Sequence, residues 1–500
     1  MVDRRGFVRG AAGTAGAFAV TGGVGSAAGR TERVLRGTLP PGAPDYVYLP
    51  VEVPPGVREF RVSYAYDRPA VPPGTQGNAL DIGVFDERGT GPGGRGAPPD
   101  GRGFRGWSGG ARTEFFLRAD DATPGYLAGP VRPGTWHIVL GPYTIAPQGL
   151  AYTVTVRLTY GSAGPVRRPV YPPERARGRG RAWYRGDCHL HTTHSDGRRT
   201  PAEVAAAARA AGLDFINTSE HNTHAGHGAW EGLWGDDLLV LTGVEVTTRT
   251  GHLLAVGTDP GTFVDWRHRA RDDRSGRTAR AIRRAGGLAV PAHPHATCVG
   301  CGWRSGFADA DAVEVWNGPY TPDDEVTLAH WDSGLAAGDR WVPAMGGSDA
   351  HREPDRVGGP QTVVLADDLT RGAVLAGLRA GRSYVAESSA VSLAFSVTGG
   401  RGGHAGIGGR LAVPPGTPVT ARLDVTGAPG CTAHFVTDQG LVHSAPLPAS
   451  GAGTVEWTTT PARAGYVRAE VRHPAVLPPL PGALAAFTNP VFLGAVRAAP

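Results

Sequence analysis

Residues from about 183 to 386 repeat a pattern of short apolar run, polar loop and helix, and histidines or carboxylates follow one apolar run after another. The first of these groups contains His189 and His191. On an extended segment their imidazoles point to the same side, because side-chain direction repeats every second residue. A divalent metal requires such convergent nitrogen donors. In a chain with 17 histidines one such pair is weak evidence, so the later groups decide its meaning.

The later candidate ligands also lie at or just past the carboxyl ends of predicted strands. They are Asp196, His221, Glu245, His252, His293, Asp349 and His351. In a (β/α) barrel these ends converge on one face, where the active site is built. The pattern therefore predicts an α/β fold, a (β/α) barrel over residues 183–386, with a metal site on one face.

Helix signals separate the strands. Thr200 is a candidate N-cap, Pro201 the first helical residue and Glu203 the partner in a capping box, and Gly212 is expected to end the helix. A second helix is predicted around residues 279–284.

Alternating apolar residues predict β-structure on both sides of this region. Residues 31–162 and 387–500 are predicted to form β-sandwich domains, and the Pro- and Arg-rich residues 163–182 a linker. For the β-domains a packing or spacer role is favoured over contact with glycans or the cell wall, since a fold does not give a function.

Residues 1–30 resemble a bacterial twin-arginine signal peptide. Arg4 and Arg5 precede a weakly apolar stretch that ends in small residues. This predicts export, and hence a periplasmic, cell-wall-associated or extracellular protein. No later apolar run reaches the roughly 20 residues of a membrane span, so none is predicted.

Charge and cysteine content exclude other classes. The net charge is only +5, and the 50 basic residues, all arginine, are interspersed with acids, which does not indicate a nucleic-acid surface. Cys298 and Cys301 are predicted to form a local disulfide in preference to a metal site, because no second CxxC pair exists. The sequence does not indicate the oligomeric state.

At least five histidines and three carboxylates exceed the needs of one ion. Two or three divalent metal ions that share Glu245 as a bridge fit this ligand count better. Clustered metals activate water and stabilise the oxygens of a displacement, which favours hydrolysis.

The ordered motifs resemble those of the PHP (polymerase and histidinol phosphatase) superfamily over about 200 residues. They are His189-Leu190-His191, Ser195-Asp196-Gly197, Glu220-His221, Gly243-Val244-Glu245, Ala292-His293-Pro294 and Ser348-Asp349-Ala350-His351. The ending Phe487-Thr488-Asn489-Pro490-Val491-Phe492 and the spacing from Glu245 to His252 look more like its secreted, carbaryl-hydrolase-like branch. The resemblance implies a distorted seven-stranded barrel and a di- or trinuclear site.

The same resemblance implies a distribution of ligands. His189, His191, Glu245 and Asp349 would hold the first metal; Glu245, His293 and His252 the second; Asp196, His221 and His351 the third. Zn, Mn or Fe all suit such ligands. Glu220 stands where the family commonly has Asp, and is expected to support ligands without being one.

Three functions remain open at this point. A phosphoesterase acting on a small anionic ester is favoured, with Glu245 and Asp349 in the catalytic centre and Arg304 facing the substrate anion, although a solvated surface arginine is the alternative for Arg304. The second is a carboxylic or carbamate ester hydrolase. The third is a non-enzymatic surface- or glycan-binding protein with an inactive barrel, against which the intact ligand set counts.

Overall fold

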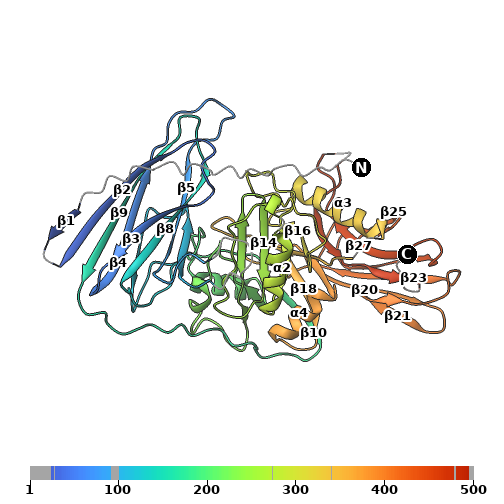
Figure 1. Cartoon of the computed structure of the whole chain (residues 1–500). Helices are drawn as coiled ribbons and strands as arrows, with labels where there is room; N and C mark the ends of the chain where they lie inside the picture. The colour runs from blue at the N-terminus through green and yellow to red at the C-terminus, as the bar shows by residue number, and fades with distance from the viewer. Residues whose placement is uncertain are drawn as a thin grey trace, which may run out of the picture.

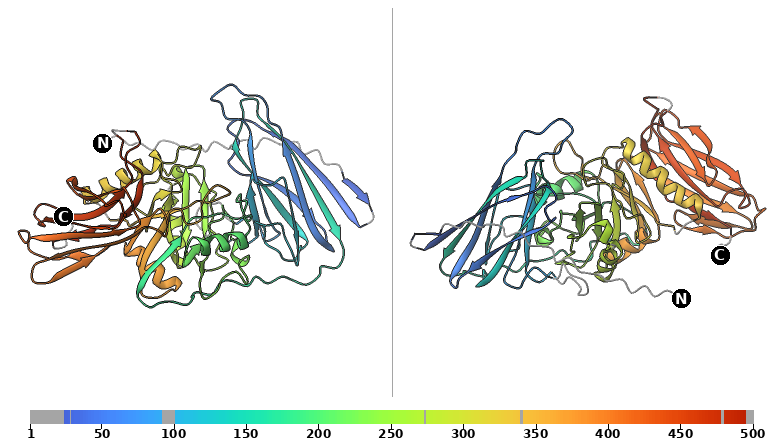
Figure 2. Two further views of the ribbon diagram at one scale, coloured as in Figure 1. Left: turned by 180° about the vertical axis from the view of Figure 1, so that it is seen from behind. Right: turned by 45° about the horizontal axis from the view of Figure 1, so that its top comes forward.

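The computed structural model describes residues 24–27, 29–91, 101–272, 274–338, 341–477 and 480–494. These residues form a β-rich N-terminal region, a central region of strands and helices, and a β-rich C-terminal region (Figure 1). Two further views keep the central region between the other two (Figure 2). The predicted signal peptide falls mainly on residues 1–23 and 28, outside the described residues.

The N-terminal region consists of two antiparallel sheets packed face to face. The first has the order β1 (Val24–Ala27), β2 (Arg30–Leu39), β9 (Leu150–Tyr160), β4 (Val57–Tyr66) and β7 (Glu114–Arg118). The second has the order β3 (Val47–Val53), β8 (Gly134–Thr144), β5 (Ala79–Phe85) and β6 (Phe104–Gly109). Alternate residues of β4 and β9 are buried, and Phe60 stacks on Trp136 with ring centroids 4.9 Å apart, which joins the two sheets.

A second apolar cluster connects this sandwich to the central region. Phe85, Phe104 and Trp107 of the sandwich are buried together with Leu253 and Trp266 of the central region. The rings of Trp107 and Trp266 lie 5.0 Å apart. Because each such buried side chain contributes roughly 1.5–3 kcal/mol, the two regions share a core and are not merely tethered.

Residues 161–181, which include most of the predicted linker, contain no helix or named strand and run along the central region to β10 (Figure 1). Backbone hydrogen bonds hold this segment in place, for example from Ala176 to Leu369 at 3.1 Å and from Arg177 to Asp236 at 3.0 Å.

The central region contains three sets of paired strands. The largest sheet begins with β12 (Leu239–Leu241), β11 (Phe215–Asn217), β10 (Ala182–Asp187), β18 (Gln361–Ala366) and β19 (Ser383–Ala386). The other two are β13 (Val244–Thr248), β14 (Gly251–Val256) and β15 (Leu288–Ala292), and the pair β16 (Val313–Asn317) and β17 (Ala344–Gly347).

The predicted seven-stranded barrel is not present as a closed structure among the described residues. The fold is mixed α/β, mostly sheet with few helices, and the ladders of the three strand sets remain separate. Two reversals of direction explain the difference. β14 is antiparallel to both β13 and β15, and β18 is antiparallel to β10, whereas a (β/α) barrel requires parallel neighbours throughout.

In the part of the chain that the structure describes, four α-helices accompany these strands: α1 (Pro201–Ala210), α2 (Ser275–Arg284), α3 (Pro322–Ala337) and α4 (Arg371–Arg379). Short 3₁₀ turns lie at Ala225–Gly228 and Ala270–Asp272. The predicted capping box of α1 is confirmed, since Thr200 accepts a hydrogen bond from the Glu203 backbone and the Glu203 side chain accepts one from the Thr200 backbone.

The C-terminal strands form two sheets around a common core. One sheet has the order β21 (Gly403–Gly406), β20 (Ser392–Gly399), β23 (Val419–Thr426) and β26 (Gly453–Thr459). The other continues the large central sheet from β19 through β28 (Leu484–Thr488), β27 (Tyr466–Arg472), β24 (Thr432–Thr437) and β25 (Gly440–Pro446), with β22 (Arg410–Leu411) and β29 (Val491–Leu493) beside it. Hydrogen bonding therefore crosses the predicted boundary at residues 386/387.

Asn489, within the motif near the C-terminus, connects this sheet to the central region. Its amide donates to the carbonyl oxygens of Ala344 (2.9 Å) and Ser383 (3.0 Å), and its side-chain oxygen accepts from the Ala344 backbone at 2.8 Å. This buried side chain thereby fixes the start of β17, the strand that leads to Asp349.

No helix in the described part of the chain has both the length and the apolar character needed to span a membrane.

Candidate metal centre

All nine predicted ligands lie together. They form four overlapping groups in which the ligand atoms lie within 4.8 Å of one another: His191, Asp196, His221 and His351; His189, His191 and Asp349; His189, Glu245 and His293; and His221, Glu245 and His252. The strand ends explain the convergence. β10 ends just before His189, β15 just before His293 and β17 just before Asp349.

Glu245, on β13, is the centre of this arrangement. Its Oε1 lies 2.8 Å from Nδ1 of His252 and 3.1 Å from Nε2 of His293. Its Oε2 lies 2.8 Å from Nδ1 of His221 and 3.5 Å from Nε2 of both His189 and His191. One carboxylate thus faces two different sets of imidazoles, as a bridging ligand must.

Asp349 completes a group with the first two histidines. Its Oδ1 lies 3.2 Å from Nε2 of His189 and 3.0 Å from Nε2 of His191. Three donor atoms from two separate strand ends therefore point at one another.

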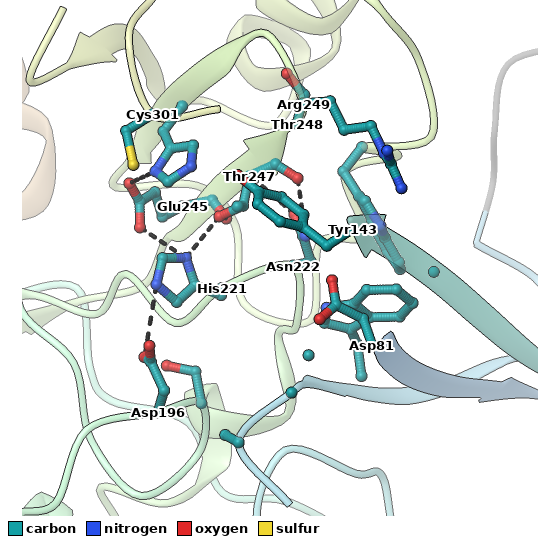
Figure 3. A pocket seen from close by; sticks show the side chains of 18 of the residues that line it. Asp81, Tyr143, Asp196, His221, Asn222, Glu245, Thr247, Thr248, Arg249 and Cys301 are labelled. Atoms are coloured by element: carbon teal, nitrogen blue, oxygen red, sulfur yellow. Dashed lines mark hydrogen bonds and ion pairs between the residues drawn. The ribbon is translucent and has the colours of Figure 1, made fainter. Parts of the chain in front are cut away.

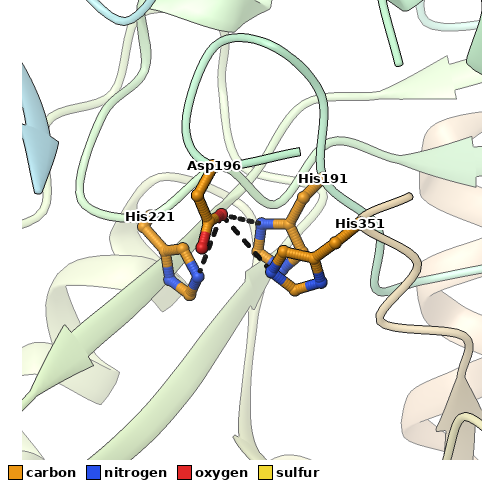
Figure 4. A group of neighbouring side chains, drawn as sticks. All are labelled: His191, Asp196, His221 and His351. Carbon is orange, nitrogen blue, oxygen red and sulfur yellow. Dashed lines mark ion pairs between the residues drawn. The ribbon is translucent and has the colours of Figure 1, made fainter. Parts of the chain in front are cut away.

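Asp196 is the carboxylate of the remaining group (Figure 4). Its Oδ1 lies 3.3 Å from Nε2 of His351, 3.5 Å from Nε2 of His221 and 4.0 Å from Nδ1 of His191. Its side chain is 44% exposed, which makes this the most open part of the cluster.

Buried atoms without hydrogen bonds show that these residues fit metal ions. Six ligand atoms are buried and lack a hydrogen-bond partner: Nε2 of His189, His191 and His252, Nδ1 of His293, Oε2 of Glu245 and Oδ1 of Asp349. Each unsatisfied buried polar group costs about 1–3 kcal/mol. Four of these atoms face one another, because Nε2 of His189 and of His191 lies 3.0–3.5 Å from Oε2 of Glu245 and from Oδ1 of Asp349. They are the expected donor set of a metal ion.

Glu314 is a functional residue that sequence reasoning missed. This buried glutamate of β16 lies with Oε1 2.9 Å from Nδ1 of His189, and its Oε2 accepts from the backbone N–H of His293 at 2.8 Å. A carboxylate behind a histidine fixes the ring and its tautomer, so that the opposite nitrogen is free for a metal. The sequence signal was a lone glutamate inside an apolar strand.

Two further buried carboxylates hold the loops that carry ligands. Asp187 accepts hydrogen bonds from the backbone N–H groups of His189 (3.1 Å) and Ser348 (3.0 Å). Glu220 accepts from the hydroxyl groups of Thr192 and Ser195, both at 2.5 Å. The Glu220 carboxylate therefore supports the loop before Asp196 and belongs to none of the four ligand groups.

Two ligands have an unusual backbone. His293 has φ of 28° and Asp349 has φ of 50°, in a region that residues other than glycine rarely adopt. Such a conformation costs of order 1–3 kcal/mol and is typical of functional sites, where the surrounding structure enforces it.

The charges of the cluster are strongly coupled. Burial alone would raise the pKa of Glu245, but His221, His252 and His189 hold it well below its usual value. Burial, followed by the neighbouring His351 and His221, lowers the pKa of His191 to about 3, so that its imidazole is neutral. Against the effect of burial, Glu245 and Asp196 raise the pKa of His221 to about 10. A metal ion that binds there must therefore displace a proton from this imidazole.

Other predicted or nearby residues do not join the cluster. Arg304 is exposed and does not line the cavity described below, so the structure does not place it against a substrate at the metals. His227 is buried between Gly243 and Gly261, with hydrogen bonds of 2.9 and 3.0 Å to their backbones. The ligand groups also do not include His194, His224 or His295.

The predicted disulfide between Cys298 and Cys301 is present. Both cysteines line the cavity over the metal centre. Cys188, between Asp187 and His189, is a free, buried residue of the core.

A cavity of about 650 Å³ opens onto the candidate ligands, and the N-terminal sandwich forms one of its walls. Asp81 of β5 and Tyr143 of β8 line it, together with Arg249 of the turn between β13 and β14 (Figure 3). Sequence reasoning assigned these three residues no role, because they lie in segments without any ligand motif.

Comparisons with protein-family models and with curated proteins find no match for this chain. Among solved structures, it is similar to a two-domain protein from Bacteroides vulgatus that contains a predicted PHP-like metal-dependent phosphoesterase. The identity is 16% over 65% of this chain and 99% of the other, with a TM-score of 0.36.

Two further structures match smaller parts. A protein from Bifidobacterium adolescentis, described as a proposed metal-dependent phosphoesterase, is 21% identical over 37% of this chain and 92% of its own, with a TM-score of 0.26. An amidohydrolase from Chromobacterium violaceum, with bound sulfate and no metal, is 19% identical over 35% and 89%, also with a TM-score of 0.26. The resemblance to the PHP superfamily rests on the sequence motifs, and these structural neighbours do not address the carbaryl-hydrolase-like branch.

Proposed function

We propose that this protein is a metal-dependent hydrolase that uses two or three divalent ions and cleaves phosphoric esters. The observation that carries the proposal is the position of Glu245, whose two oxygens face separate sets of histidines at 2.8–3.5 Å. A single ion would leave most of the nine donors without a role.

The distances support a division of ligands that follows the motifs. His189, His191 and Asp349 would hold one ion, and His252 and His293 a second, with Glu245 between them. Asp196, His221 and His351 would hold a third. Nitrogen and carboxylate donors of this kind suit Zn, Mn or Fe.

Bound ions would supply Lewis acidity, which lowers the pKa of water and neutralises charge on the ester group. The chain's own residues prepare the site for them. Glu314 Oε1, which lies 2.9 Å from Nδ1 of His189, would accept the Nδ1 proton and so leave Nε2 for an ion. Glu220 holds the loop between His191 and Asp196, which keeps the open end of the cluster in place.

A phosphoric ester is favoured because three cationic positions in one enclosed site match a dianionic phosphate better than a neutral ester. A carboxylic or carbamate ester is the second candidate, since the same activated water attacks either carbonyl.

Paired chromogenic substrates test this proposal. The protein loaded with Zn, Mn or Fe is assayed on p-nitrophenyl phosphate and p-nitrophenyl acetate. We expect faster turnover of the phosphate, lost on removal of metal and in Asp349→Asn but kept in Asp120→Asn, a surface change on the sandwich. Turnover of the acetate alone would establish the second candidate, and turnover of neither would overturn hydrolysis of these esters.

A further inference from the structure

The wall of the cavity contributed by the N-terminal sandwich contains a carboxylate without a partner. Among the described residues, the side chain of Asp81 has no hydrogen bond or ion pair, although it lines the cavity. Glycines surround it: a Cβ at Gly109 or Gly110 would lie 3.8 or 3.6 Å from its Oδ1, and one at Gly141 would lie 3.3 Å from its Cβ. Because no side chains stand at these positions, the space beside the carboxylate stays open.

Aromatic rings line the same side of the cavity. Tyr46, Trp107, Tyr143 and Trp266 all contribute to its lining. The rings of Tyr46 and Trp107 pack edge to face with centroids 6.3 Å apart. A ring face attracts a cation through its quadrupole, most strongly where water is excluded. A carboxylate beside aromatic rings is therefore a chemically suitable site for an organic cation.

The charged neighbours of Asp81 are engaged elsewhere. Arg249 pairs with Asp45 at 3.3 Å, and its guanidinium lies over the ring of Tyr143, 5.7 Å from the centroid. In Figure 3, Asp81, Tyr143 and Arg249 lie to one side of the cavity, and Asp196, His221 and Glu245 lie to the other. The cavity thus has two sides. One is formed by the candidate metal ligands, and the other, which we call the Asp81 wall, by Asp81 with Tyr46, Trp107 and Tyr143.

We propose that the Asp81 wall binds an ammonium group on the alcohol part of the substrate, which makes this protein selective for aminoalkyl phosphate esters. The inference rests on the proposed function in one respect, since it places the phosphate at the metal centre. Asp81 would accept hydrogen bonds from the ammonium. Tyr46 and Trp107 would surround the methylene groups of the substrate next to that ammonium.

The environment of Asp81 agrees with a cationic ligand. Burial raises the pKa of Asp81 to about 7, against the opposing effects of Arg249 and His221. An ammonium in contact with the carboxylate stabilises its ionised form, so that binding recovers part of the cost of keeping an acid in this wall.

Matched phosphonates test the proposal, because they are not hydrolysed. Binding to the metal-loaded full chain is measured by calorimetry for 2-aminoethylphosphonate and 3-aminopropylphosphonate, and for the propyl- and butylphosphonates in which a methyl replaces the ammonium. Hydroxyalkylphosphonates of equal length form a third series. We expect an amino probe of at least one length to bind about tenfold tighter than both neutral partners, the range for a charge-assisted hydrogen bond.

The variants assign this preference to one residue. Asp81→Asn should bring the amino and alkyl probes to within about twofold while the alkyl probe binds as before, and Asp120→Asn should keep the wild-type ratio. Three results would each overturn the proposal. They are equal binding of amino and alkyl probes by the wild type, equal loss of both in Asp81→Asn, and a preference for hydroxyl over ammonium. A preserved preference without hydrolysis of p-nitrophenyl phosphate or of 2-aminoethyl and 3-aminopropyl phosphate would instead refute the proposed function alone.

Discussion

The guanidinium of Arg112, on the N-terminal sandwich, donates a hydrogen bond to the carbonyl oxygen of Ser195 at 3.1 Å and another to that of Thr193. Both carbonyls belong to the loop between His191 and Asp196. The sandwich therefore holds the segment that carries the most exposed carboxylate of the metal cluster.

Loss of this contact should weaken the metal site selectively. Arg112→Ala is expected to lower affinity for the most weakly bound ion by about 10- to 100-fold, the usual effect of removing a group that orients a ligand. Competition with a chelator measures this, with Arg118→Ala on the same sandwich as the control. Arg112→Lys should restore part of the affinity. An Arg112→Ala protein that unfolds earlier but keeps its metal affinity would show a purely structural role.

Replacement of the proposed bridge should have the largest effect. Two dications about 4 Å apart repel by roughly 16 kcal/mol at an effective dielectric constant near 20, which the Glu245 charge offsets. Glu245→Gln keeps the volume and removes the charge, so we expect loss of at least one metal equivalent and of nearly all turnover. Glu314→Gln, an equally buried control outside the ligand groups, should lose roughly 10- to 100-fold in metal affinity. Elemental analysis that finds unchanged metal in Glu245→Gln would refute the bridge.

The stability of the C-terminal region should depend on Glu470. Its Oε1 accepts from Arg468 at 2.5 Å and its Oε2 from Arg472 at 2.6 Å. Burial opposes ionisation, but these arginines lower the pKa of Glu470 to about 2. Since this pKa lies below the unfolded value of 4.5, the stabilisation is complete above pH 4.5 and disappears as the pH falls through 2.

Urea unfolding at pH 5 and pH 3 measures this contribution. Glu470 should account for about 2 kcal/mol of the decrease in the unfolding free energy between these two pH values. Glu470→Gln should be less stable at pH 5, because it leaves two buried arginines less well paired, and its decrease toward pH 3 should be smaller by that amount. An unchanged pH dependence would contradict the assignment.

Export by the twin-arginine route remains a prediction from the sequence. Arg4→Lys with Arg5→Lys should keep the protein in the cytoplasm with its activity intact, because the pair is an address read by a receptor. Fractionation and immunoblotting measure the distribution, with Arg9→Lys as the control. Normal export of the double variant would favour a general secretory route.

Several ligand positions could be predicted because they follow an apolar run that is itself a strand. Glu245 and His252 differ from that expectation, since they are the second residues of β13 and β14. His293 after β15 and Asp349 after β17 are local signals of this kind, and a short motif contains all the information needed. Arg112, Asp81 and Glu314 carry no such signal. The contacts of Arg112 join residues 81 and 83 positions apart, and that of Glu314 with His189 joins residues 125 positions apart. Asp81 faces the candidate ligands only across the cavity, and no local pattern records such relationships.

The prediction of a closed barrel was wrong because it, too, depends on relationships between distant segments. Strand and helix periods do not record whether a neighbour runs parallel or antiparallel. Gly251, at the turn into β14, has φ of 116°, and a Cβ there would lie 2.4 Å from Cα of Trp303. Only glycine permits this close approach, and the turn that it enters makes β13 and β14 antiparallel. The long segment that contains α2 then brings β15 antiparallel to the other edge of β14.

The cavity is lined by two parts of the chain, the N-terminal sandwich and the central region. The candidate metal ligands lie between residues 189 and 351, whereas Asp81, Tyr46 and Trp107 come from a domain that supplies no ligand. Mutations in the sandwich can therefore alter which molecules fit without a change in the atoms that would hold the ions. Descendants of such a protein can acquire new substrates through substitutions in the sandwich while the ligand-bearing region stays constant. A survey of its relatives should therefore compare the sequences of β5 and β6 before those around the histidines.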